Sequence, residues 1–364
     1  MKLHLLLVSL AALALAGCKE ERESPAPKLV ATALPFEIES IRIEQVATNL
    51  PTWIQALSFI DASVGIASTY DGKVYRTSDG GKNWSLQYTA GTTANLPLLQ
   101  ILFTSGSVGY IVGGTVSCNG NGCQPPGGRI LKTTDAGVTW TEVHRVSGAA
   151  IASIAVNSTG DLFAVANTSG SQIIKSSDAG ATWAPVADWP YQLNKITFDR
   201  NLGYGASGNS GGSGPTATNT GKIIRSTDNG ATWAEAALFD YPYLSELAFS
   251  TGIGFCVQGY GTVYKTTNDG MSWKPAINGS EFNDFSAQVV TPLTPASCLI
   301  FGAGPYSGGD FGTFSGSVRQ STDAGNSWTG IELKTVNTVR QASFYTPQNG
   351  YALAGTTLLK ITVK

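Results

Sequence analysis

Hydrophobic positions in this chain fall in short runs that alternate with polar, glycine-rich turns. One unit of the pattern has a run ending at Phe59, a second run at residues 64–66, a third at residues 74–76 and a fourth after Trp84. The same order of runs returns further along the chain. Runs this short, separated by turn residues, predict β-strands rather than helices.

Six polar turns within this pattern share one form, Ser/Thr-x-Asp/Asn-x-Gly-x-Thr/Ser/Asn-Trp. We call them the box turns, and they span residues 77–84, 133–140, 176–183, 226–233, 266–273 and 321–328. Their third position is Asp79, Asp135, Asp178, Asp228, Asn268 or Asp323. A short carboxylate accepts backbone N–H groups inside a tight turn, Gly adopts positive φ, and Trp supplies a large apolar surface. We therefore interpret these side chains as turn-formers rather than catalysts or metal ligands.

Four short strands in each repeating unit are typical of β-propeller blades. A seventh unit, residues 339–364, has three of the four runs and then ends, which would leave a sheet edge exposed. Residues 38–46 read as a strand without a sheet of its own. We predict an all-β fold over residues 38–364: a seven-bladed β-propeller of four-stranded antiparallel blades, closed by this N-terminal strand, which completes the last blade.

The N-terminus begins with Lys2 and an apolar run at residues 4–16 that is too short to span a bilayer. The run ends in Leu-Ala-Gly-Cys, which resembles the lipobox of bacterial lipoproteins. We predict a lipoprotein signal peptide at residues 1–17, lipidation of Cys18 and a solvated tether at residues 18–37. An ordinary signal peptide is the alternative. The protein is expected to be exported and lipid-anchored to the outer membrane, facing the periplasm or the cell surface.

Composition narrows the functional classes. Only 13% of residues are charged and the formal net charge is −2, which argues against a nucleic-acid binder. The two histidines, His4 and His144, leave little material for a His-ligated metal site or a His-based triad. No cofactor and no metal are expected.

The box turns resemble the Asp box, or BNR repeat, of β-propellers. Seven units with a Phe run and a Gly-Tyr element before each box resemble the photosystem II assembly and stability factor family, over residues 38–364. That resemblance implies a non-enzymatic scaffold with a protein or peptide partner, and we expect a monomer. A sialidase-like glycan-binding or glycan-hydrolysing propeller is the alternative. Residues 40–43 lack the aromatic residue and the proline of the sialidase Phe/Tyr-Arg-Ile-Pro motif.

Connections in a propeller alternate between two faces, and the long insertions at residues 113–128, 205–221 and 302–317 fall on one of them. Exposed aromatic residues on such a rim favour a peptide, protein or glycan partner. The candidates are Trp189, Tyr191, Tyr241, Tyr243, Phe282, Tyr306 and Phe311. The alternative is that several of them pack beneath neighbouring loops.

A second candidate site appears when the first strands are aligned on their terminal Phe. The residue three positions earlier is Ala56, Gln100, Ser153, Lys195, Glu246, Gln288 or Gln341. Polar residues in otherwise apolar strands predict the wall of the central channel, where Lys195 and Glu246 can pair. These side chains either bind a ligand or form a solvated wall.

A basic residue precedes most box turns: Arg76, Lys132, Lys175, Arg225 and Lys265, with Lys360 at the matching place in the last unit. This ring either docks a partner or packs over apolar edges and box tryptophans.

The cysteines fit an oxidising compartment. Cys118 and Cys123 enclose a short Gly-rich loop and predict a disulfide, with a metal site as the weaker alternative. Cys256 and Cys298 are interpreted as buried thiols, with an inter-blade disulfide as the alternative.

Overall fold

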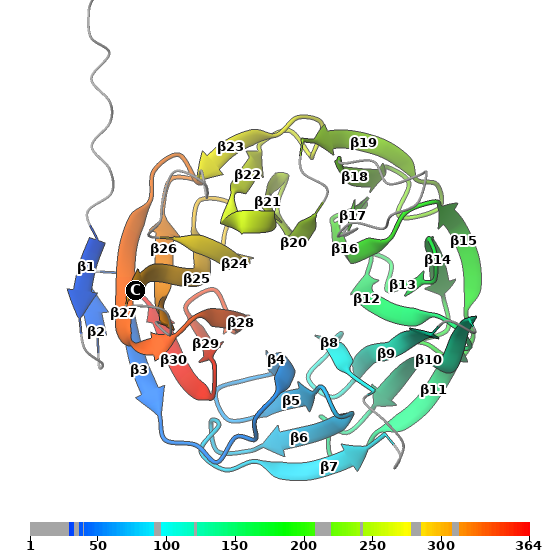
Figure 1. Cartoon of the computed structure of the whole chain (residues 1–364), viewed down its shortest axis with the longest axis horizontal. Coiled ribbons are helices and arrows are strands. Elements are labelled where there is room, and N and C mark those ends of the chain that lie inside the picture. The colour runs from blue at the N-terminus through cyan, green and yellow to red at the C-terminus, as the bar shows by residue number, and fades with distance from the viewer. Residues whose placement is uncertain are drawn as a thin grey trace, which may run out of the picture.

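Seven β-sheets stand radially around one axis and form a closed ring (Figure 1). This computed structural model describes residues 29–32, 36–38, 40–90, 96–119, 122–207, 220–240, 243–277, 285–307 and 313–364. Each sheet contains four antiparallel strands in the order of a propeller blade, and two sheets carry one extra strand at the outer edge. The predicted seven-bladed β-propeller is confirmed.

Six blades are built from consecutive strands. Blade 1 contains β4 (Ile54–Phe59), β5 (Gly65–Thr69), β6 (Lys73–Thr77) and β7 (Ser85–Thr89). Blade 2 contains β8 (Leu98–Phe103), β9 (Gly109–Asn119), β10 (Gly122–Thr133) and β11 (Thr141–Val146). Blade 3 contains β12 (Ala150–Val156), β13 (Leu162–Asn167), β14 (Ser171–Ser176) and β15 (Ala184–Trp189).

The later blades follow the same plan. Blade 4 contains β16 (Leu193–Asp199), β17 (Leu202–Ser207), β18 (Gly221–Ser226) and β19 (Ala234–Phe239). Blade 5 contains β20 (Leu244–Ser250), β21 (Ile253–Gln258), β22 (Val263–Thr266) and β23 (Lys274–Ile277), with the short helix η1 (Gly259–Gly261) between β21 and β22. Blade 6 contains β24 (Ser286–Pro292), β25 (Cys298–Ser307), β26 (Thr313–Ser321) and β27 (Thr329–Asn337).

Blade 7 joins the two ends of the chain. It contains β28 (Val339–Thr346), β29 (Asn349–Ala354), β30 (Thr357–Val363) and, as its fourth strand, β3 (Ile41–Val46). The β3 strand pairs antiparallel with β30, so that Ile43 lies opposite Ile361. The predicted closure of the ring is thereby confirmed.

Two further strands lie outside the ring, in the stretch predicted as a tether. The β1 strand (Leu29–Thr32) runs parallel to β27 on the outer edge of blade 6. The β2 strand (Phe36–Ile38) pairs antiparallel with β3 on the outer edge of blade 7 (Figure 1). Regular structure therefore begins earlier in the chain than the sequence pattern indicated.

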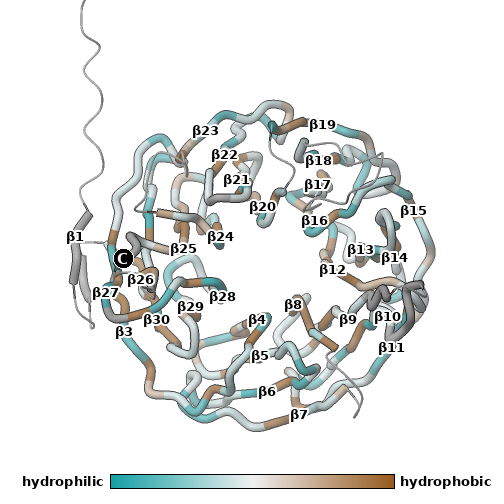
Figure 2. Tube along the Cα trace, in the orientation of Figure 1, coloured by the Kyte–Doolittle hydropathy of each residue, from teal (hydrophilic) through white to brown (hydrophobic). Residues whose placement is uncertain are grey.

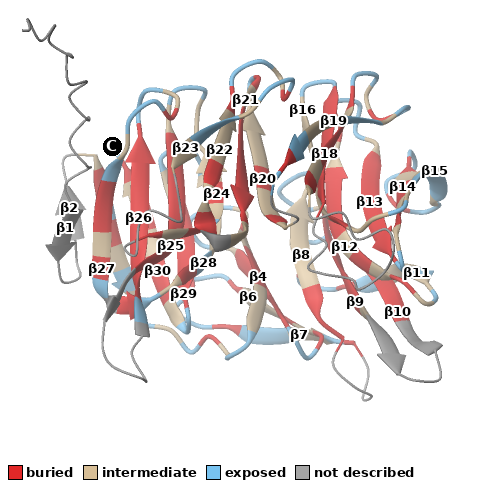
Figure 3. Cartoon of the chain, turned by 45° about the horizontal axis from the view of Figure 1, so that its top comes forward, coloured by how far each residue is buried: buried red, intermediate tan, exposed pale blue. Residues whose placement is uncertain are grey.

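The core lies between neighbouring blades rather than inside any one sheet. All described residues of β5, β13 and β17 are buried, whereas the fourth strands of blades 1 to 5 are mostly exposed or half-buried. Figure 3 shows this as buried strand interiors with exposed loops at both ends of the blades. Hydrophobic and hydrophilic positions are interspersed around all seven blades (Figure 2).

The repeated Phe, Gly and Trp positions form one packing unit. In blade 5 the Phe249 ring meets the box residue Trp273 edge-on, with ring centroids 5.8 Å apart. The ring also lies over Gly254, where an added Cβ would stand 2.3 Å from it. The same relation holds between Gly65 and Phe59, at 2.7 Å. The Gly-Tyr element therefore requires glycine because an aromatic ring occupies the space of its side chain.

Candidate functional site

The box turns lie on one face of the ring, and the links between blades lie on the other. Each box turn lies beside the turn between the first two strands of its own blade: the Gly80 N–H donates to the Ser63 carbonyl over 2.9 Å. We call this side the box face. The inter-blade links lie beside the turns between the second and third strands: the Tyr70 N–H donates to the Trp53 carbonyl over 3.0 Å. We call this side the link face.

The box turns close their hydrogen bonds internally. In the turn of blade 4, one oxygen of Asp228 accepts from the Thr232 N–H at 2.8 Å and the other from the Thr232 hydroxyl at 2.6 Å. The Ser226 hydroxyl accepts from the Gly230 N–H, and the Trp233 indole N–H donates to the Gly230 carbonyl. Asn268 keeps this geometry, with its amide oxygen accepting from the Ser272 N–H. These side chains are engaged within their own turns.

Hydrogen bonds from the residue four positions later lower the pKa of the box carboxyls to about 2, as in Asp135, Asp178, Asp228 and Asp323. A carboxylate held so firmly in its ionised form is a poor proton donor near neutral pH.

The basic ring connects neighbouring blades. Arg76 donates to the Ala136 carbonyl in the next box turn at 2.9 Å, and Lys132 donates to the Ala179 carbonyl at 2.7 Å. Lys265 reaches Asn326 in the same way. Lys175 instead pairs with Asp161 of its own blade, at 2.8 Å. Three of the six basic residues, Arg76, Lys132 and Lys265, therefore link one blade to the next.

The junction between blades 7 and 1 is different because it holds a cavity of about 840 Å³. Lys360, Lys82, Asp79 and Glu44 are among the residues that line it. The box turn here has Gly80 where the other five have a residue with a side chain. At this junction the β3 strand from the N-terminal part of the chain and the β30 strand from the C-terminal part lie beside blade 1.

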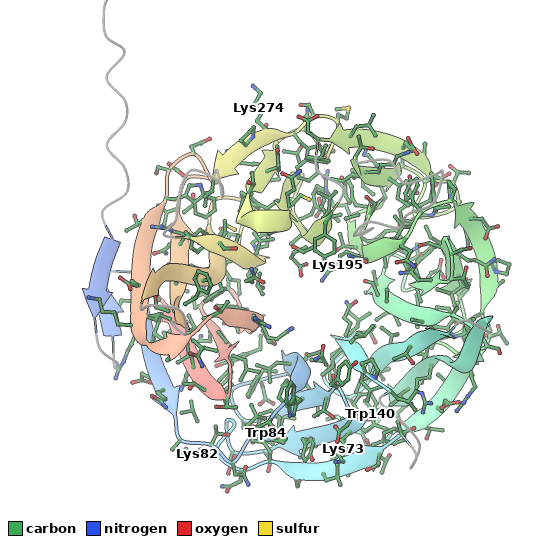
Figure 4. The ribbon with its side chains drawn as sticks, viewed as in Figure 1. Lys73, Lys82, Trp84, Trp140, Lys195 and Lys274 are labelled. Carbon is green, nitrogen blue, oxygen red and sulfur yellow. The ribbon has the colours of Figure 1, made fainter. Side chains whose placement is uncertain are left out.

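The predicted channel residues meet around a cavity of about 420 Å³ on the ring axis. The inner strands of all seven blades contribute to its wall, and six of the seven aligned residues line it: Ala56, Gln100, Lys195, Glu246, Gln288 and Gln341. Figure 4 shows Lys195 at the inner margin of the ring. Ser153 is buried behind this wall instead. The ligand-binding role of these residues stays a prediction.

Two of these polar residues link blades 2, 3 and 4. Gln100 accepts from the Ser153 hydroxyl at 2.8 Å and from the Ile154 N–H at 3.0 Å, and it donates to the Ile154 carbonyl at 2.9 Å. Ser153 in turn accepts from the Ile196 N–H at 3.1 Å. The amide of Gln100 is thus engaged in the structure and is the weakest ligand-binding candidate of the set.

Other side chains of the channel wall, in blades 4, 5 and 7, are available for interaction. Lys195 and Glu246 form the predicted pair, with Nζ to Oε1 at 2.8 Å, and both side chains keep about a fifth of their surface exposed. Asn194, Arg340 and Gln341 also line the cavity, and their side chains make no hydrogen bond within the part of the chain that the structure describes. Side-chain amides and one ion pair therefore face the same polar space.

The aromatic candidates on the link face are half-buried where the structure describes them. Trp189 and Tyr191 pack together with ring centroids 5.7 Å apart, and the Tyr191 hydroxyl donates to Glu235 at 3.1 Å. Lys222 lies over the Tyr191 ring. Burial raises the pKa of the Tyr191 hydroxyl. This pair forms a local cluster at the edge of the core, as the alternative interpretation expected.

Tyr243 is also half-buried. Tyr241, Phe282 and Phe311 lie outside the described residues, as does the side chain of Tyr306. Cys18 lies outside them as well.

Sequence reasoning missed Trp53 and Tyr70 on the link face. They have 78% and 42% of their surfaces exposed, and both line a cavity of about 430 Å³. A signal was present, because six of the eight tryptophans belong to box turns and Trp53 is one of the two that remain.

The cysteines divide into two pairs. Cys256 and Cys298 are free and buried, so the inter-blade disulfide is not formed, and burial raises the pKa of both thiols. Cys118 and Cys123 are cross-strand partners in the β9–β10 register, and their side chains lie outside the described part. The disulfide between them stays a prediction.

Among the described residues, no cluster of three or more His, Cys, Asp or Glu side chains is arranged to hold a metal ion. The same residues include no helix with the length and hydrophobicity needed to cross a membrane.

No protein-family model matches the chain, and no curated protein is similar to it. Among solved structures, YCF48 bound to a D1 peptide is similar over 92% of this chain and 100% of that chain, with a TM-score of 0.63 and 17% identity. YCF48 from Cyanidioschyzon merolae is similar over 88% and 98%, with a TM-score of 0.58 and 15% identity.

A GH74 xyloglucanase from Xanthomonas campestris is similar over 87% of this chain and 53% of that chain, with a TM-score of 0.59 and 15% identity. At these identities the likeness shows the fold alone: the chain is a seven-bladed β-propeller with YCF48 and a GH74 xyloglucanase among its structural neighbours.

Proposed function

We propose that this protein is a non-enzymatic binding scaffold of the bacterial cell envelope that holds a peptide segment of a protein partner at its central channel. The observation that carries the proposal is a set of unengaged side chains in the wall of the cavity that also holds the Lys195–Glu246 pair: Asn194 in blade 4, and Arg340 and Gln341 in blade 7. A side-chain amide presents a donor next to an acceptor, as a peptide group does. Such a wall suits an extended backbone.

The ion pair adds selectivity to this wall. Lys195 and Glu246 are partly exposed, so each can exchange its present partner for a charged group of a bound peptide. The YCF48 structure with a D1 peptide, which has the same fold, supports a peptide partner. The box-turn side chains and several of the basic residues that precede them already bond within the structure. We therefore place partner recognition at the channel and on the link face.

Peptide-display selection against the purified protein, followed by titration of the selected sequences, tests this function. The Lys195→Ala/Glu246→Ala variant and Gln341→Ala are each expected to weaken binding by about tenfold or more. Lys274→Ala is the control, because Lys274 is exposed on the outer strand β23. Peptides that bind the channel variants as tightly as the parent would contradict the proposal.

The envelope location rests on the N-terminal sequence. We propose that Cys18 carries a diacylglycerol, that the protein faces the periplasm or the surface from the outer membrane, and that it is a monomer. Metabolic labelling with a palmitate analogue should mark the parent and not Cys18→Ala, and the variant should leave the membrane fraction. A labelled Cys18→Ala protein would contradict lipidation at this residue.

A glycan-active propeller is the second candidate, and the similarity to a GH74 xyloglucanase favours it. A panel of chromogenic glycosides separates the two functions. Turnover by the parent that is lost in Glu246→Gln would replace the scaffold with an enzyme whose acid or base lies in the channel.

A further inference from the structure

Trp53 has an unfavourable backbone conformation that burial of its side chain does not offset. Its φ is +66°, in the left-handed region that bulky side chains rarely adopt. Its indole is 78% exposed. The other described non-glycine residues with positive φ are a box-turn set (Ala136, Ala179, Asn229, Asp269, Ala324) and two residues of strand-connecting turns (Arg200, Thr251). Trp53 combines an unfavourable backbone with an unburied aromatic surface.

The repeats supply an internal reference for this position. Trp53 directly precedes the inner strand β4, as Tyr243 precedes β20 and Phe285 precedes β24. The backbone is used alike in blades 1 and 5: the Trp53 carbonyl accepts from the Tyr70 N–H at 3.0 Å, and the Tyr243 carbonyl accepts from the Gly259 N–H at 2.8 Å. Phe285 is only 2% exposed. Tyr243 is half-buried, so both reference side chains pack at least partly against the fold, whereas Trp53 is turned outward.

The outward indole forms one wall of the cavity of about 430 Å³ on the link face. Tyr70, 42% exposed, and the half-buried Tyr75 also line it. Flat aromatic walls bind ligands that present a flat apolar face. The cavity therefore offers aromatic surface to a ligand that has a flat apolar face.

The polar side chains of this cavity already bond to one another, and the positive charge of Lys73 is paired with the negative charge of Asp71. Lys73 Nζ lies 2.6 Å from Asp71 Oδ2, and the Thr69 hydroxyl donates to the other oxygen of Asp71 at 2.5 Å. An ammonium group carries three donors, so Lys73 retains the capacity to donate further. A charged ligand would have to compete with the Asp71–Lys73 pair, whereas a neutral ligand with hydroxyl groups bonds to it as it stands.

We propose that Trp53, Tyr70 and Tyr75, together with the Asp71–Lys73 pair, form a binding site for a neutral sugar ring. The apolar face of the sugar stacks on the Trp53 indole, and its hydroxyl groups meet the ion pair and the threonine side chains of the cavity. The site is separate from the channel and does not depend on the peptide-binding function proposed above.

Titration of the purified protein with cellotriose, maltotriose, xylotriose and N-acetylchitotriose, by calorimetry, tests the site. We expect saturable binding of at least one of these, weakened by about tenfold or more in Trp53→Ala and less strongly in Tyr70→Ala. Leu238→Ala is the matched control, because Leu238 is 65% exposed in the fourth strand of blade 4. The Lys195→Ala/Glu246→Ala variant should bind the sugar unchanged.

Trp53→Gly distinguishes a binding role from a structural one. Glycine adopts positive φ without strain, so this variant should keep or raise the thermal midpoint while it loses the sugar. A clearly lowered midpoint would assign Trp53 to internal packing. The proposal is also overturned if no trisaccharide binds saturably, if Trp53→Ala binds as the parent does, or if this variant loses a proline-rich peptide or phosphatidylglycerol vesicles instead of a sugar.

Discussion

The box face and the link face are built from the same chain in opposite ways. On the box face, six turns repeat one hydrogen-bond pattern, down to the Trp indole that donates to the Gly carbonyl in the turns of blades 1 to 5. On the link face, the corresponding positions differ from blade to blade: Phe285 is buried and Trp53 is exposed. Repetition marks the residues that hold the ring together, and the proposals above place recognition where the repeat is broken.

The sharpest test of this difference is one substitution made on each face. Trp140→Ala removes a buried box side chain and is expected to lower the free energy of unfolding by about 3–5 kcal/mol. Trp53→Ala removes an exposed side chain and should change it by less than about 0.5 kcal/mol. Urea unfolding followed by circular dichroism measures both. Equal losses on the two faces would invalidate the contrast.

Acid should weaken the box turns. The box carboxyls have pKa values of about 2, below the ordinary value near 4 that they regain on unfolding. Their contribution to stability is therefore complete above about pH 4 and is lost as the pH falls from about 4 to about 2. Asp228→Asn introduces the residue that blade 5 already has at this box position, Asn268, and should reduce the dependence of stability on pH in this range. Thermal midpoints measured across the range test it, and an unchanged profile would contradict the assignment.

The Phe–Gly contact predicts an intermediate effect. Gly254→Ala places a methyl group against the Phe249 ring and is expected to lower the free energy of unfolding by about 1–3 kcal/mol. Gly106→Ala is the control, because an added Cβ there meets no atom within 4 Å. Chemical denaturation of the two variants should separate them clearly.

The smallest expected effect concerns the links between blades. Lys132→Met removes one donor to the Ala179 carbonyl, but the Tyr110 hydroxyl also donates to that oxygen at 2.8 Å. We expect a loss of about 0.5–1 kcal/mol, compared with none for Lys274→Met on the outer strand. A loss of several kcal/mol would indicate that the basic ring carries more of the stability than its contacts suggest.

The sequence predicted the parts of the fold that repeat. Six copies of the box turn, with their Phe and Gly-Tyr elements, predicted a blade of four strands. The incomplete last unit, together with residues 38–46, predicted how the ring closes. The β1 and β2 strands were missed because they belong to no repeat and pair only with outer edges.

The candidate site was predicted less fully. Alignment on the Phe positions found the channel wall, because the repeat brings the same position of each inner strand to the same place in the ring. It did not reveal that Gln100 is engaged by Ser153 and Ile154, because this depends on contacts between blades. Nor did it find Trp53, because the outward turn of that side chain depends on a single backbone angle.

The pairing of β3 with β30 also governs how the protein is made. The β3 strand is synthesised before its partner β30, and the strands of all six other blades lie between them in the chain, so these strands must be made before the two can meet. Until then both edges stay open to pairing with other chains. Closing a contact of such wide sequence separation is slow. Until β30 is made, the newly synthesised protein therefore depends on factors that prevent aggregation of the incomplete ring.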